Sequence, residues 1–362
     1  MIRDMMGRIY RNFKGEILVL PGRTLALLVG LAIFIAPLLT RDIYILRIIT
    51  LTSIFAVFAA SWDLLSGFVG QLNLGHALFF GVAAYTSAML NLYLKLPPLL
   101  TIPLGAIAAV AAGLAIGIPC LRLKGQYLSL ATLAFPIILK GVVYIFKQYT
   151  GGELGVSGIS RLAGSRLAEC YIALLLGVSL CLLIWKITDS KLGLIFHAIR
   201  EDEIAARASG INTTAYKLLA FCLSGLFAGI AGGFYAHYMR LAGPSMLDVM
   251  LSFQAIIWTI FGGIATVYGA VTGVVILFPL MEVMRAFPEI RMLFFAVTIV
   301  IVLRFMPEGV APWFLDRVEK ECPRCKERNA FTRRNCRVCR TLLIAGKEVS
   351  AGTEGQTGHP TD

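Results

Sequence analysis

The sequence predicts an all-α polytopic membrane protein with about ten transmembrane helices and a small cysteine-bearing module after the last helix. Three observations support this fold class. Of the 362 residues, 58% are hydrophobic and only 15% are charged, whereas charged residues make up about a quarter of an average soluble protein. Apolar runs of the length needed to cross a bilayer, about 20 residues, recur along most of the chain. The 35 glycines favour helices that pack closely in lipid.

The expected transmembrane domain covers residues 24–306. Its spans are residues 24–40, 43–62, 72–94, 99–121, 127–146, 171–187, 218–238, 250–267, 270–284 and 292–306. The run "WTIFGGIATVYGAVTGVVIL" is divided here into two spans, and a single broken helix is the alternative.

Basic residues predict the orientation of the bundle. The N-terminal arm, residues 1–23, carries five basic residues against two acidic ones, and cytoplasmic loops are the ones that collect Lys and Arg. Residues 186–217 follow the sixth crossing and also carry five basic residues. We therefore expect a multi-pass protein of the plasma or inner membrane with both termini in the cytoplasm. The net charge of +12 is attributed to these loops, and no nucleic-acid partner is expected.

The run "SGFVGQLNLGHALFFG" interrupts the apolar pattern with glycines and with polar Gln71, Asn73 and His76. Irregular backbone at membrane depth persists only where protein or a water-filled cavity covers it. This run is therefore predicted to be a broken or re-entrant element that lines a translocation path. The alternative is that its polar side chains bond to neighbouring helices and hold them together.

The run "SGLFAGIAGG" places Gly225, Gly229 and Gly233 four residues apart. Glycines on one helical face allow another backbone to approach closely. A tight helix contact is predicted here, either within the chain or with a partner.

The stretch "REDEIAARASGINTTAYK", residues 200–217, is charged and lies after the sixth span. A short helix with small side chains fits a groove on another protein, its acidic turn can pair with basic groups there, and a glycine just past the last turn commonly ends such a helix. The candidate docking residues are Arg200, Glu201, Asp202, Glu203, Ala205, Ala206 and Gly210. The alternative is an ordinary solvated loop.

The chain lacks the sequence motifs of several enzyme classes. It has no Gly-x-x-x-x-Gly-Lys-Ser/Thr loop to hold nucleotide phosphates, and neither a His-Glu-x-x-His nor a Gly-x-Ser-x-Gly motif. We expect a protein that is not an enzyme, and any ATP that drives it is expected to bind to a separate polypeptide.

The segment "ECPRCKERNAFTRRNCRVC" contains two Cys-x-x-Cys pairs separated by ten residues. This spacing predicts a zinc-ribbon-like module over residues 318–343, in which four thiolates surround one structural Zn²⁺; iron is the alternative metal. The predicted ligands are Cys322, Cys325, Cys336 and Cys339. Residues 344–362 are poor in large apolar side chains and are expected to be disordered.

Three blocks in order carry a family resemblance: "SWDLLSGFVGQLNLGHALFFGVAAYTSAML", "TGGELGVSGI" and "AIREDEIAARASGINTTAYKLLAFCLSGLFAGIAGGFYAHY". From about residue 43 to residue 304 the chain resembles LivM-type permease subunits of branched-chain amino acid ABC importers. The third block is similar to the segment that couples such permeases to their ATPases, with Glu203, Ala205, Ala206 and Gly210 at the matching positions and Ile204 as an extra residue. The cysteine-bearing tail departs from the family pattern.

The resemblance implies a permease that imports leucine, isoleucine and valine. Its implied partners are a second, LivH-like permease, two cytoplasmic ATPase subunits, which alone bind ATP, and an extracytoplasmic substrate-binding protein. Residues 149–160 are expected outside the cell, either as part of the surface for the binding protein or as a plain loop.

Three alternatives remain open at this point. The chain is also compatible with a permease of the same family for urea, amides or other small organic solutes. An ion-coupled secondary transporter would use ionisable residues inside the bundle, of which Asp63 and His76 are the candidates. A membrane-anchored metal or redox sensor would use the tail as its working part.

Overall fold

The computed structural model describes residues 21–40, 42–120, 126–287 and 308–322, together with short runs and single positions between 293 and 339. Chain contacts divide the protein into two units. One unit, Leu31–Trp313, contains the helical bundle, and the other comprises Met1–Gly30 and Phe314–Asp362. The expected arm 1–23, apart from its last residues, and the tail 344–362 lie outside the described residues.

The described part of the chain is almost wholly helical. Its α-helices are α2 (Pro21–Leu39), α3 (Ile43–Asp63), α4 (Ala77–Tyr93), α5 (Pro98–Cys120), α6 (Gln126–Ile145), α7 (Lys147–Thr150), α8 (Arg166–Thr188), α9 (Lys191–Glu201), α10 (Glu203–Ala208), α11 (Thr213–Met239), α12 (Val249–Gly262), α13 (Val267–Val283) and α15 (Val310–Val318). Shorter helical turns are η2 (Leu64–Phe68), η3 (Pro244–Leu247) and η4 (Met284–Ala286). Two antiparallel two-stranded ladders pair β1 (Val156–Ser157) with β2 (Leu241–Ala242) and β3 (Glu319–Glu321) with β4 (Arg328–Ala330).

The helices confirm an all-α polytopic membrane protein. Among the described residues, five helices are long and apolar enough to cross a bilayer: α3 with η2, α5, α6, α8 and α11. Two shorter apolar helices, Leu28–Leu39 of α2 and α4, fall at the predicted spans 24–40 and 72–94. Predicted spans 250–267 and 270–284 correspond to α12 and α13, and within span 292–306 the described positions are short helical runs.

The predicted break before residue 77 is present, but the helix that follows it is shorter than expected. The helix α3 ends at Asp63 and continues through the π-turn η2, after which residues 69–76 are irregular and α4 begins only at Ala77. The expected span 72–94 therefore loses its first five residues to the connection between α3 and α4.

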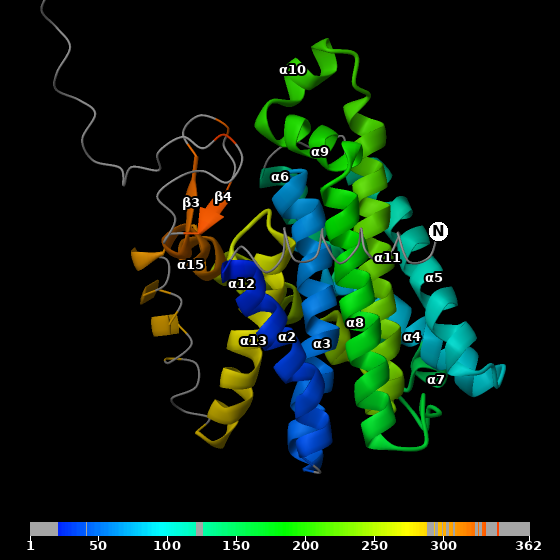
Figure 1. Cartoon of the computed structure of the whole chain (residues 1–362). Helices are drawn as coiled ribbons and strands as arrows, with labels where there is room; N and C mark the ends of the chain where they lie inside the picture. Colours follow the sequence, from blue (N-terminus) through cyan, green and yellow to red (C-terminus); the bar gives the residue numbers. More distant parts are fainter. Residues whose placement is uncertain are drawn as a thin grey trace, which may run out of the picture. The chain divides into compact units, whose positions relative to one another are not determined.

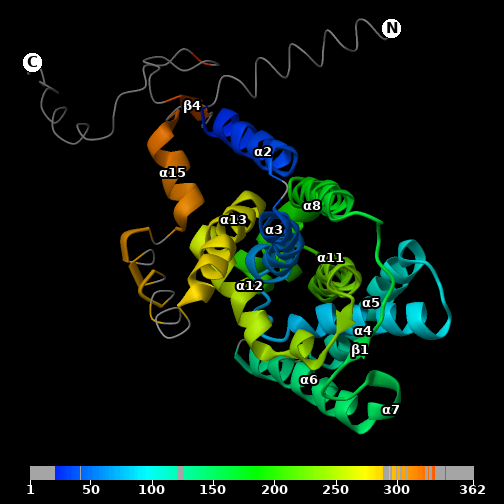
Figure 2. The same cartoon turned by 90° about the horizontal axis from the view of Figure 1, so that it is seen from below.

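The helix α3 is the core of the bundle. Every residue from Ile54 to Asp63 is buried, and α8, α11, α12 and α13 all pack against it (Figures 1 and 2). A helix buried on all sides occurs only inside a large bundle. The position of α3 therefore determines how the other spans are arranged.

The glycine face of α11 makes the predicted tight contact, and the contact is within the chain. A side chain at Gly229 would lie 2.8 Å from the Cα of Ala106 on α5, and one at Gly225 would lie 2.9 Å from the ring of Phe79 on α4. The backbone of α11 therefore lies directly against two neighbouring helices. Because glycine has no side chain, the helices approach closely at these positions, and the resulting van der Waals packing holds them together in lipid.

The helices α12 and α13 form a bent pair, which corrects the prediction of two separate spans. They contain 14 and 17 residues and meet at an angle of 110°. The bend requires Gly263, whose φ of 128° is open to glycine but strained for other residues. Beyond the bend α13 runs back along α3, since the hydroxyl of Tyr44, at the far end of α3, donates to the carbonyl of Glu282 at 3.2 Å.

Replacing Gly229 by valine is expected to destabilise the bundle by about 1–3 kcal/mol, because the added side chain overpacks the contact between α11 and α5. The midpoint of thermal unfolding in detergent measures the effect. Gly30→Val is the matched control, since no described atom lies within 4 Å of the position where a Gly30 side chain would begin. Equal midpoints for the two variants would contradict the importance of the glycine contact.

Candidate functional site

The charged stretch, residues 200–217, forms the end of α9, all of α10 and the start of α11, at one end of the bundle (Figure 1). Asp202 separates the two short helices. Its extended backbone ends α9, and its Oδ1 accepts hydrogen bonds from the backbone N–H groups of Ile204 at 2.8 Å and Ala205 at 3.0 Å. An aspartate in this position satisfies donors that the first turn of a helix leaves free.

Gly210 ends α10, as the sequence predicts. Its φ is +86°, its N–H donates to the carbonyl of Arg207 at 3.0 Å, and the N–H of Ile211 donates to the carbonyl of Ala206 at 3.1 Å. These two bonds are the Schellman arrangement, which requires a left-handed residue at this position. The helix α10 is thus fixed in length at both ends.

Glu203 ties α10 to α11. Its carboxylate accepts from Lys217 Nζ at 2.5 Å, from Arg207 at 2.8 Å and from the hydroxyl of Thr213 at 3.3 Å. Burial alone raises the pKa of Glu203, but the hydrogen bond and charge of Lys217, with Thr213 and Arg207, outweigh burial and lower the pKa below its ordinary value. The carboxylate is therefore ionised at neutral pH.

The helix α9 packs on the end of α3. The ring of His197 lies 5.2 Å from that of Phe68 in η2, and the side chain of Arg200 lies over Gly70, where an added Cβ would come within 3.2 Å of it. On the inner face, Phe196 and Ile199 are buried in the main core. The two short helices are therefore part of the bundle rather than a solvated loop.

The predicted docking residues divide into two groups. Asp202 and Glu203 are bonded within the chain, and Ala206 is buried in the core, whereas Glu201 and Ala205 are exposed. Sequence reasoning missed two exposed apolar side chains on this surface: Ile204 is 80% exposed and Leu194 is 73% exposed. The signal was present for Ile204, a large aliphatic residue within a polar segment, whereas Leu194 lies in the apolar run "LGLIF".

Among the polar residues expected to line a path, His76 makes structural contacts. Its Nε2 lies 2.9 Å from the hydroxyl of Ser61 and 3.2 Å from the carbonyl of Phe58, both on α3. The imidazole is fully buried and its centre lies 4.7 Å from that of the Phe58 ring. These contacts hold the start of α4 against α3.

Asn73 both caps a turn and lines a small cavity, while Gln71 is partly exposed. The Asn73 Oδ1 accepts from the N–H of Gly75 at 2.9 Å, and its backbone carbonyl accepts from Trp62 Nε1 at 2.7 Å. Its buried Nδ2 has no hydrogen-bond partner among the described residues. It borders a cavity of about 10 Å³ with Thr132, which is room for about one water molecule.

The connection between α6 and α8, at the opposite end of the bundle from α10 (Figure 1), is anchored to the bundle. The carbonyl of Ser160 lies 2.9 Å from His237 Nδ1, and the N–H of Ser160 donates to Asn91 at 2.9 Å. The strands β1 and β2 add a short ladder. Leu154 is 86% exposed in this connection, so the segment presents an apolar side chain from a fixed base.

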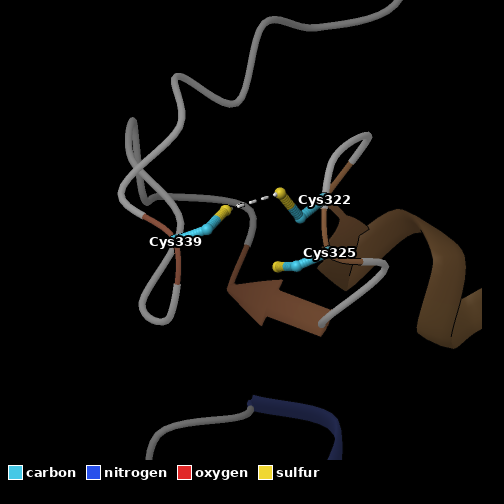
Figure 3. Close-up of side chains that lie close together, drawn as sticks. All are labelled: Cys322, Cys325 and Cys339. Carbon is cyan, nitrogen blue, oxygen red and sulfur yellow. Dashed lines mark hydrogen bonds between the residues drawn. The ribbon is translucent and has the colours of Figure 1, made fainter.

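Three of the four predicted metal ligands lie together in the tail. The Sγ atoms of Cys322, Cys325 and Cys339 are all within 4.8 Å of one another, and those of Cys322 and Cys339 are 3.4 Å apart (Figure 3). A tetrahedral site with Zn–S bonds near 2.3 Å places its sulfurs about 3.8 Å apart, so this spacing fits a metal. The fourth predicted ligand, Cys336, lies outside the described residues.

Comparison with known proteins identifies the class. Residues 44–303 match the family described as "Branched-chain amino acid transport system / permease component". The chain is 31% identical over 294 residues to the high-affinity branched-chain amino acid transport system permease protein LivM of Escherichia coli, covering 73% of this chain and 69% of that protein. The corresponding protein of Salmonella typhimurium is 30% identical with the same coverage. A ribose import permease of Haemophilus influenzae is 26% identical over 280 residues, covering 73% of this chain and 83% of that protein.

The matched residues include α3 to α13, and thus every element that holds the contacts described above for α9 and α10. The chain therefore belongs to the branched-chain amino acid transport system permease family and is a multi-pass membrane transport component.

Proposed function

We propose that this chain is the permease subunit of an ABC importer for branched-chain amino acids, driven by ATP that partner subunits hydrolyse. Its similarity to the two LivM proteins supports amino acids as substrates, because the ribose permease is less similar. The observation that carries the ATP-driven role is the pair α9–α10, which exposes Ile204, is bonded to α11 through Glu203 and packs on the end of α3 through His197.

The proposed coupling runs through two contacts. Force applied at Ile204 moves α10, which the Glu203–Lys217 ion pair joins to the start of α11. The same movement displaces α9, which lies on the end of α3 through His197. Both spans are central in the bundle, so motion of an ATPase subunit would alter the packing around them.

The proposed assembly contains a second, LivH-like permease, two cytoplasmic ATPase subunits and an extracytoplasmic binding protein. In this arrangement α9, α10 and both termini face the cytoplasm. The anchored connection bearing Leu154 then faces outward and offers an apolar contact to the binding protein.

Ile204→Asp is expected to reduce the amount of ATPase subunit that co-purifies with the permease by about tenfold or more. Burying an isoleucine contributes about 1.5–3 kcal/mol, and every 1.4 kcal/mol changes an affinity tenfold. Ile204→Leu is the matched control and should retain the ATPase. Full retention by Ile204→Asp would remove Ile204 from the docking surface.

Glu203→Gln and Lys217→Gln are each expected to lower the number of leucine molecules imported per ATP hydrolysed, because either change disconnects α10 from α11. The double variant should be no worse than the more affected single variant, which is the signature of a shared interaction. Lys191→Gln, at an exposed position on α9, is the control. A normal transport ratio in both single variants would show that this ion pair does not transmit coupling.

We also propose that the tail binds one structural Zn²⁺ through Cys322, Cys325, Cys336 and Cys339. The clustering of the three described thiols supports this proposal. Cys322 follows β3 directly, and Cys325 lies in the connection to β4. Four thiolate ligands leave no open coordination position, so the metal stabilises the module rather than carrying out chemistry.

The purified protein is expected to contain one zinc per chain by elemental analysis. Cys325→Ser should remove it, and the backbone amides of β3 should then exchange hydrogen faster, because zinc binding stabilises such small modules by about 10–16 kcal/mol. Cys222→Ser, in α11, is the control. Leucine uptake should persist when residues 321–362 are deleted. Full zinc content in Cys325→Ser would contradict the assigned site.

A further inference from the structure

An ion pair joins α6, a candidate membrane span, to the residue that precedes α12. Lys140 Nζ on α6 donates to Asp248, the residue that precedes α12, across 108 positions of sequence. Lys140 belongs to the candidate span Tyr127–Ile145 and lies five residues before its end, about 8 Å along the helix axis. The two side chains are 30% and 42% exposed, respectively.

This partial exposure is informative because charged groups at membrane depth are costly. They face the interior of a bundle or a water-filled cavity, and they mark substrate or ion pathways in membrane proteins. A pair whose side chains are about one-third exposed is neither fully buried in the core nor fully solvated. The pair therefore lies at a surface of this chain, near one end of α6, where a substrate or solvent can reach it.

The side of α6 that carries Lys140 fits this interpretation. Ile137 and Tyr144 share its helical face, three residues before and four residues after the lysine, and they are 53% and 40% exposed. An apolar side chain, an ammonium group and a phenol thus lie together on a face that the described residues leave partly exposed.

The carboxylate of Asp248 is committed to the lysine. Asp248 occupies the position before the first turn of α12, yet among the described residues its side chain makes no capping bond to that helix. The helix α12 is also one half of a discontinuous pair, bent by 110°. Substrate sites of transporters recur beside such interrupted helices.

We infer that Lys140 and Asp248 recognise the charged backbone of an α-amino acid during translocation, an inference that rests on the proposed import function. The substrate carboxylate pairs with the ammonium of Lys140, and the substrate ammonium pairs with the carboxylate of Asp248. Each charge exchanges one partner of opposite sign for another, so no unpaired charge forms at membrane depth. Ile137 lies on the same face and offers an apolar contact to a branched side chain.

The competing explanation is a purely structural tie between α6 and the start of α12. The two explanations differ in their response to reversal of the pair. In the double variant Lys140→Asp/Asp248→Lys the tie is restored, but the two charges are presented to the substrate in exchanged positions. If the pair is only structural, the double variant should recover both stability and uptake. If the pair recognises the substrate, the double variant should recover only stability.

The test uses the complete transporter, purified with its partner subunits and reconstituted into vesicles, with radiolabelled leucine as the probe. Lys140→Met and Asp248→Asn are each expected to lower the maximal ATP-dependent uptake rate about tenfold, a loss of about 1.4 kcal/mol. The half-saturating leucine concentration, set by the binding protein, and the amount of co-purified ATPase should stay unchanged. The reversed pair should regain the wild-type unfolding midpoint but not the uptake rate.

Recovery of uptake in the reversed pair, or wild-type uptake in both single variants, would overturn the inference while leaving the import function in place. Wild-type vesicles that fail to accumulate leucine with ATP present would instead overturn the proposed function, and the recognition site along with it. Lys95→Gln, at an exposed position between α4 and α5, is the charge-removal control and should transport normally.

Discussion

The carboxylate of Asp63, buried where α3 ends, is the interaction on which the arrangement of the working parts depends. Its Oδ1 accepts from the N–H of Ala265 at 2.8 Å and so fixes the bend between α12 and α13 to α3. Position 67 requires glycine, because a Cβ at Gly67 would collide with this carboxylate. Arg200 on α9 lies over Gly70, in the irregular connection that follows η2. Because a buried polar group that loses its hydrogen bond costs about 1–3 kcal/mol, this bond holds α3 and the bend between α12 and α13 together at this point.

This junction connects the two ends of the proposed mechanism. In that mechanism, displacement of α9 by an ATPase subunit moves η2, against which His197 packs. The turn η2 directly follows Asp63, which holds the bend where α12 ends. The other end of α12 begins beside Asp248, 14 residues away, or about 21 Å along a rigid helix. A tilt of α12 about its fixed end therefore alters the separation of Asp248 from Lys140. In this scheme coupling passes through the hydrogen bond of Asp63, the helix α12 and the Lys140–Asp248 ion pair.

Local sequence rules predicted the features that depend on local backbone geometry. A glycine after a short helix predicted the end of α10 at Gly210, and glycines spaced by four predicted the close face around Gly229. The Cys-x-x-Cys pattern predicted the grouping of Cys322 with Cys325. The features that were missed depend on residues far apart in sequence: the partner of Lys140 is 108 positions away, and the bend after α12 is stabilised by Asp63, 202 positions earlier. Sequence periodicity and composition do not predict such pairs, because the pairs form only when the helices pack against one another.

The exposure of Ile204 and the pairing of Glu203 change the interpretation of the charged stretch, residues 200–217. An acidic turn suggests ionic docking, yet exposed ion pairs contribute only about 0–1 kcal/mol, and Glu203 is already paired within the chain. Burying Ile204 in a groove contributes about 1.5–3 kcal/mol, and this term is insensitive to salt. The acidic residues then act indirectly: Asp202 sets where α10 begins, and Glu203 holds α10 to α11. In the proposed assembly, contact with an ATPase subunit therefore depends on an aliphatic side chain whose position the charged residues determine, in a segment that is polar in composition but exposes Ile204.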